Sequence, residues 1–140
     1  MTHIRIPVAP GELIDKITIL EIKSRRIRDE SKLRNVRHEL ELLNAVWGEM
    51  GECASDISDL RRQLAGINEK LWQLEDDIRE LEGRGDFGER FVELARSVYR
   101  TNDQRVSIKR EINTCLHSDI MEEKSYTDYG RVDSARYRSA

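Results

Sequence analysis

Residues 55–82 read SDISDLRRQLAGINEKLWQLEDDIRELE, and the spacing of their apolar side chains decides the fold. These side chains recur at alternating steps of three and four residues, at Ile57, Leu60, Leu64, Ile67, Leu71, Leu74, Ile78 and Leu81. An unbroken heptad pattern predicts an amphipathic helix with a single apolar stripe. At roughly 1.5 Å per residue, this helix would be about 42 Å long. Gly83 and Gly85 follow it, and glycine suits the left-handed conformation that ends many helices.

A second long helix is expected over residues 87–116, with Asp86 as its N-cap because a carboxylate can accept the free N–H groups of a first turn. Its apolar residues continue a similar stripe, through Phe91, Leu94, Val98, Ile108, Ile112 and Cys115. A short glycine-rich connection between two long amphipathic helices favours an antiparallel hairpin.

The N-terminal half predicts two further helices, over residues 10–26 and 30–50. Pro10 suits a first turn, where its missing N–H would have no partner anyway. The helix over 10–26 is apolar on more than one side, which favours a central position. We therefore expect an all-α domain over residues 10–117: an elongated four-helix bundle of two helical hairpins, the second a long antiparallel coiled coil.

Three shorter features complete the expected organisation. Asp29 is the predicted cap of the helix over 30–50. Residues 1–9 are expected to form an extended arm. Residues 118–140 are expected to form a short helix near Ile120–Lys124 and then a loose tail with tyrosines, of which Tyr126 is the one expected to dock on the bundle.

Composition excludes several classes of function. The chain has 140 residues, 36% of them charged, and a net charge of −3 with no basic arm, so we expect no nucleic-acid partner. No apolar run approaches the roughly 18 residues of a membrane span, and the N-terminus does not resemble a signal peptide. Two distant cysteines, Cys53 and Cys115, then indicate reduced thiols and a cytoplasmic protein.

The sequence predicts no catalytic residues, no metal site and no cofactor. The three histidines lack ligand-like spacing, and there is no nucleophile motif and no glycine-rich phosphate loop. Acidic pairs three residues apart occur no more often than composition predicts. In the acidic run of residues 75–77, Glu75 lies one turn from Arg79, so we expect a solvated charged face there rather than a metal site.

Polar residues interrupt the apolar stripe of the hairpin. With the turn at residues 84–85, Asn68 would face Asn102, and Arg105 would lie where an apolar residue is expected. In one interpretation these residues specify register, and Arg105 pairs with a carboxylate inside the bundle. In the other, Arg105 forms an anion pocket between helices, with further basic side chains from Lys109, Arg61 and Arg62. We favour the structural pair.

The helix over 10–26 carries charges among isoleucines, so some of them must be at least partly buried. A site between helices would draw on these charges and on polar residues of the hairpin. The candidate ligand-binding residues are Asp15, Lys16, Lys23, Glu75, Asn102 and Arg105.

Several strings resemble a family of small bacterial proteins known only as a domain of unknown function. They are PGELIDKITILEIK at residues 10–23, LW at 71–72 with EDDIR at 75–79, ARSVYRTND at 95–103, KREIN at 109–113 and EEKSY at 122–126. The resemblance covers roughly residues 4–129. It departs at Ala9, where a serine that forms a capping box with Glu12 is expected. The resemblance implies an association with sugar-transfer proteins, and hence an accessory role in bacterial glycan synthesis, but no activity.

Two functions follow as expectations. The first is a non-enzymatic helical assembly or adaptor protein that acts through helix faces, as a homodimer or with another protein. The alternative is a small all-α enzyme or metabolite-binding protein that holds an anionic small molecule between helices.

Overall fold

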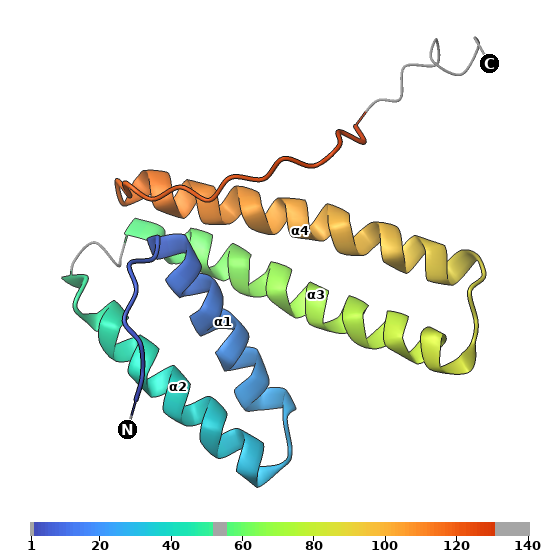
Figure 1. The fold of residues 1–140 in the computed structure, drawn as a ribbon, viewed down its shortest axis with the longest axis horizontal. Helices are drawn as coiled ribbons and strands as arrows, with labels where there is room; N and C mark the ends of the chain where they lie inside the picture. The colour runs from blue at the N-terminus through green and yellow to red at the C-terminus, as the bar shows by residue number, and fades with distance from the viewer. Residues whose placement is uncertain (1, 52–55, 131–140) are drawn as a thin grey trace.

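The computed structural model describes residues 2–51 and 56–130 of the chain. Four helices account for its regular structure: α1 (Pro10–Arg26), α2 (Glu30–Gly48), α3 (Ser58–Arg84) and α4 (Glu89–Cys115). These described ranges contain no strand, which confirms the all-α class (Figure 1). None of these four helices is both long and apolar enough to cross a bilayer.

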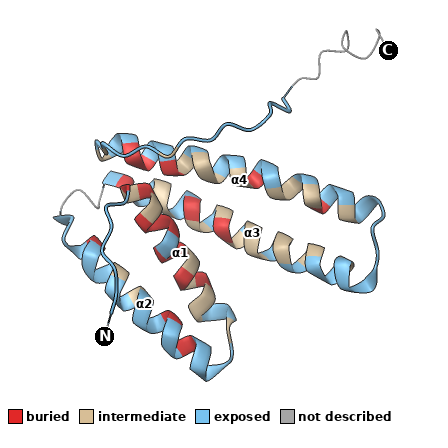
Figure 2. Ribbon diagram, viewed as in Figure 1, coloured by how far each residue is buried: buried red, intermediate tan, exposed pale blue. Residues whose placement is uncertain are grey.

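The helices form two hairpins, α1–α2 and α3–α4, that meet at one end and diverge from it (Figure 1). Helix α1 contacts the other three helices, as its apolar residues predicted. It buries Ile14 and Ile17 completely in a core that Trp47 of α2, Leu64 of α3 and Ile112 of α4 complete. Most of the buried positions therefore lie where the helices converge (Figure 2).

Local chemistry sets the ends of the helices. Asp29 caps α2 as expected, because its carboxylate accepts a hydrogen bond from the Lys32 amide at 2.9 Å. Gly85 ends α3 in the left-handed conformation, with φ of 67°. The prediction that Asp86 caps the next helix is wrong. Its carboxylate accepts from the Gly88 amide at 3.2 Å and closes a turn, so α4 begins only at Glu89.

The far half of the α3–α4 hairpin extends beyond α1. The guanidinium of Arg26, the last residue of α1, reaches Gln73 at 3.5 Å, and further along α3 the stripe residues Leu74, Ile78 and Leu81 are only half-buried (Figure 2). The projecting hairpin gives the described part of the chain an elongated shape (Figure 1). Coiled-coil packing of the hairpin stays a prediction.

The segment after α4 differs from its prediction. Residues 119–129 contain no helix, and they run back along α4 (Figure 1). The expected short helix at Ile120–Lys124 is therefore wrong. Ion pairs from Glu122 to Lys109 and from Glu123 to Arg110 hold this segment extended against α4, which outweighs the weak helix propensity of so short a sequence.

Candidate functional site

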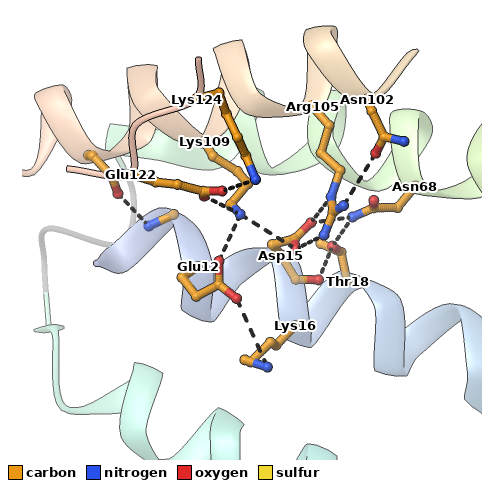
Figure 3. Close-up of polar contacts among 12 residues, drawn as sticks. Glu12, Asp15, Lys16, Thr18, Asn68, Asn102, Arg105, Lys109, Glu122 and Lys124 are labelled. Carbon is orange, nitrogen blue, oxygen red and sulfur yellow. Dashed lines mark hydrogen bonds and ion pairs between the residues drawn. The ribbon is translucent and has the colours of Figure 1, made fainter. Parts of the chain in front are cut away.

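A buried carboxylate connects three helices near the end where they converge. Asp15 of α1 is 1% exposed, and its Oδ1 accepts hydrogen bonds from Arg105 Nε of α4 at 2.8 Å and from Asn68 Nδ2 of α3 at 2.9 Å. Arg105 Nη2 also donates to Oδ2, so the ion pair is bidentate (Figure 3). Bidentate arginine–carboxylate pairs combine charge with fixed geometry, and this one sets the position of α4 relative to α1.

Thr18 extends these contacts one turn along α1. Its hydroxyl donates to the carbonyl oxygen of Asp15 at 2.9 Å and accepts from Asn68 Nδ2 at 3.0 Å. The amide of Asn68 therefore bridges two residues of α1. Asn68 and Asn102, which the register argument placed opposite each other, line the same groove. Asn102 accepts a long bond of 3.4 Å from Arg105 Nη1.

A buried lysine forms the second layer of the cluster. Lys109 is 6% exposed, and its ammonium lies 2.7 Å from a carboxylate oxygen of Glu12 and 2.8 Å from one of Glu122. The Asp15 carboxylate lies 4.0 Å away, and Lys124 pairs with the other oxygen of Glu122 at 3.0 Å (Figure 3). Lys109 thus joins α1, α4 and the C-terminal segment.

A close backbone approach brings these layers together. The amide of Gly11, in the first turn of α1, donates to Asn113 Oδ1 of α4 at 2.7 Å. A Cβ at Gly11 would lie 2.5 Å from the carbonyl oxygen of Lys109, so only glycine fits. This contact lets the side chains of Glu12 and Asp15 reach Lys109 and Arg105.

Ion pairs and hydrogen bonds within the cluster stabilise the charged forms of Arg105, Lys109 and Glu122. Hydrogen bonding and charge from Asp15 raise the pKa of Arg105 despite partial burial. Burial lowers the pKa of Lys109, but hydrogen bonds from Glu12 and Glu122 outweigh that effect and the net direction is upward. Hydrogen bonds from Lys109 and then Lys124 lower the pKa of Glu122 to about 2. All of these groups are therefore charged at neutral pH.

Each carboxylate of the cluster also has a cationic partner. Glu12, Asp15 and Glu122 pair with Arg105, Lys109 and Lys124, and the exposed Lys16 lies 4.0 Å from Glu12. Among the residues that the structure describes, every buried side-chain nitrogen and oxygen has a hydrogen-bond partner. The buried side-chain polar atoms of the cluster are therefore satisfied by groups of the protein itself.

Two grooves border the cluster at Arg105. The first, of about 420 Å³, lies between the three helices and is lined by Trp72, Glu75, Asn102 and Arg105 among others. The second, of about 640 Å³, lies between α4 and the segment that follows it. There Tyr129 stacks edge-on against Tyr99 with ring centroids 5.0 Å apart, and its hydroxyl donates to Asp103.

The order of charged and apolar residues along the whole chain matches a known family. The model of a family of unknown function, DUF6165, covers residues 4–140. The chain belongs to this family. Searches of curated proteins and of solved structures return no match. Membership of DUF6165 confirms the resemblance to a domain of unknown function and assigns no activity, so the residues must supply the functional argument.

The cluster gathers some of the candidate site residues of this DUF6165 chain and separates others. Asp15, Asn102 and Arg105 come together, as described above. Glu75 lines the smaller groove with two of them, and its carboxylate pairs with Arg79 at 3.2 Å, as the sequence suggested. Lys16 is exposed, and its nearest carboxylate, of Glu12, is 4.0 Å away. Lys23 lies two turns beyond Asp15 and makes no contact with the cluster.

The expected convergence of basic residues is observed for Arg105 and Lys109, which both approach the Asp15 carboxylate, but not for the arginines of α3. Arg61 pairs with Glu21 of α1 at 2.8 Å, and Arg62 pairs with Asp59 of its own helix on the surface. The arginines of α3 therefore do not join Arg105 in a pocket. Tyr126 also departs from expectation: it is 76% exposed, and Tyr129 docks on α4 in its place.

The predicted site residues omitted six members of the cluster. They are Glu12, Thr18, Asn68, Lys109, Glu122 and Lys124. A signal for two of them was present, because Glu12 and Asp15 lie one turn apart on α1 while Arg105 and Lys109 lie one turn apart on α4. Opposite charges at matched spacing on two helices indicate facing ion pairs. No such spacing pointed to Glu122, which lies outside the helices.

Proposed function

We propose that this protein is a non-enzymatic assembly protein whose interaction surface is the far half of the α3–α4 hairpin. The observation that carries the proposal is the apolar stripe of α3, which continues through Leu74, Ile78 and Leu81 past the end of α1. Two amphipathic helices alone leave the edges of their shared seam exposed, so such a stripe favours further helices as partners.

The tip of the hairpin supports this proposal. Phe87 is 57% exposed and Val92 is 52% exposed, and Phe87 stacks edge-on against Phe91 at 5.3 Å. Large apolar side chains that gather on one surface characterise interaction sites more than single exposed residues do. Together with the half-buried Leu74, Ile78 and Leu81 of α3, these residues are called the apolar edge of the hairpin.

The charged cluster supports the non-enzymatic part of the proposal. A site that binds an anion is expected to hold uncompensated positive charge or polar groups without partners. Here each buried cation has its carboxylate, and the bidentate pair of Asp15 and Arg105 joins two helices. These contacts support a structural role, in which the cluster fixes the angle between the hairpins.

The test is photo-crosslinking in cells that produce the protein. A photoreactive phenylalanine derivative is placed at Phe87 or Val92 on the hairpin tip, and as matched control at Leu42, which is 41% exposed on α2. We expect a discrete crosslinked product from each tip position and none from the control. Products of equal yield from all three positions, or no product from the tip, would contradict the proposal.

The second candidate function is metabolite binding in the smaller groove, because Glu75, Asn102 and Arg105 line it together. A thermal-shift screen of phosphorylated and carboxylated metabolites tests it, since a bound ligand raises the melting temperature. A specific hit that the Asn102→Ala variant loses would favour this candidate over assembly. The expected accessory role in bacterial glycan synthesis stays a prediction under either function.

A further inference from the structure

Two regions of opposite charge lie at separate extremities of the molecule. The basic turn, residues 23–37, connects α1 to α2 and contains seven lysines and arginines against two acidic residues. The acidic tip, residues 75–93, connects α3 to α4 and contains eight acidic residues against three arginines. The two connections lie apart at the free ends of the diverging hairpins (Figure 1).

Within one molecule these regions do not neutralise each other. The three arginines of the acidic tip pair with carboxylates of the same tip, in the pairs Arg79–Glu75, Arg84–Glu80 and Arg90–Glu93. In the basic turn, Arg25 and Arg26 pair with Glu69, which precedes the tip. Several exposed charges remain on each region without an ion pair in the described structure, among them Arg28 and Arg34 on the turn and Asp76 and Glu82 on the tip.

The apolar edge of the hairpin belongs to the same surface as the acidic tip. Ile78 and Leu81 are half-buried within the acidic tip, and the half-buried Leu74 directly precedes it. A partner for this surface therefore needs an apolar helical face and a basic region beside it. This chain offers both, because the hairpin is such a face and the basic turn lies at the end of the neighbouring hairpin.

We propose that the partner is a second copy of this chain, in a closed twofold dimer. A twofold axis pairs the same surface patches of both copies, so that any contact between two different patches occurs twice. The two hairpins then pack stripe against stripe, and the acidic tip of each copy lies against the basic turn of the other. This inference rests on the proposed function and names its partner.

The proposal can be tested by reversing the charge of the acidic tip in one variant and of the basic turn in another. The tip variant carries Asp76→Lys with Glu82→Lys, and the turn variant carries Arg28→Glu with Arg34→Glu. Each variant alone places like charges opposite each other at both contacts, so we expect its dimer dissociation constant to rise about tenfold or more. A mixture of the two variants restores opposite charges at both contacts and should form heterodimers as readily as the wild type forms homodimers.

Sedimentation of the full chain provides the readout. The wild type should sediment with twice the 16.4 kDa mass of one chain, each variant should shift toward the single mass, and the mixture should return to the double mass. The control carries Glu39→Lys with Glu41→Lys, two exposed changes on α2, and should remain a dimer. Circular dichroism checks that each variant keeps its helices.

The outcomes separate this inference from the proposed function. A wild-type chain that remains a single copy, a mixture that fails to regain the dimer, or a mass that keeps growing with concentration would overturn the closed dimer. If the chain stays single while the hairpin tip crosslinks to another protein, the assembly function stands and only the second copy is rejected. If neither occurs, both proposals fail.

Discussion

At the scale of single residues, Asp15 determines how three helices meet. Its carboxylate accepts from Arg105 and Asn68, which lie on the two other helices of the cluster. The sequence predicted a buried charge on this helix and a carboxylate partner for Arg105. It did not identify Asp15 as the partner of Arg105, because 90 residues separate them and matched spacing of charges on two helices does not by itself show that those helices are in contact.

Asn68 provides a test of this arrangement. If Asn68 served only to fix the register of the α3–α4 hairpin, Asn68→Leu should raise stability, because an apolar side chain packs better between the two helices. The observed bonds to Asp15 and Thr18 predict the reverse: a loss of about 1–3 kcal/mol in the free energy of unfolding, because a buried acceptor loses a donor. Chemical denaturation measures the difference. Asn102→Leu is the matched control and should be nearly neutral, so a greater loss for Asn102→Leu than for Asn68→Leu would contradict this account.

Glu122 predicts a specific dependence on pH. Its pKa is lowered from 4.5 to about 2 in the folded protein, so its contribution to stability is fully present above about pH 4.5 and is lost as the pH falls toward 2. We expect Glu122→Gln to lower the free energy of unfolding at pH 7 and to change it little at pH 2. Denaturation at both pH values measures this. A constant difference between wild type and variant would show that Glu122 does not act through its charge.

At the scale of elements, the approach of α1 to α4 depends on Gly11. Alanine there would place a methyl group against the backbone of Lys109, and overpacking of this kind costs about 1–3 kcal/mol. The matched control is Gly66→Ala, inside α3 with open space around it, which should stabilise by about 0.5–1 kcal/mol. Melting temperatures measure both. A Gly11→Ala variant as stable as wild type would show that the close approach is not required.

The helices themselves were predictable, and the reason is local. Heptad spacing, Asp29 and Gly85 act within a few residues, so they indicate where helices lie and where α2 begins and α3 ends. The path of residues 119–129 was not predictable, because it depends on ion pairs with Lys109 and Arg110 of α4. The predicted N-cap at Asp86 was also wrong. Its carboxylate accepts a hydrogen bond from the Gly88 amide instead of capping the first turn of α4.

At the scale of the whole molecule, the divergence of the hairpins is the feature that relates the fold to the proposed function. The cluster of Asp15, Arg105 and Lys109 holds the hairpins together at one end and leaves the apolar edge of α3–α4 open at the other. Composition and helical pattern predicted an elongated helical protein without a catalytic motif. They could not predict that the charges between helices are paired, because pairing depends on which side chains meet.

The measurement that tests the structural role of the cluster most directly is the unfolding free energy of Arg105→Ala, with and without about 10 mM sulfate at constant ionic strength. This account predicts a loss of about 3 kcal/mol, because Asp15 would keep a buried charge without its main partner. It also predicts that wild type and variant respond to sulfate equally. A variant at least as stable as wild type that has lost a wild-type response to sulfate would contradict the account and identify an anion site.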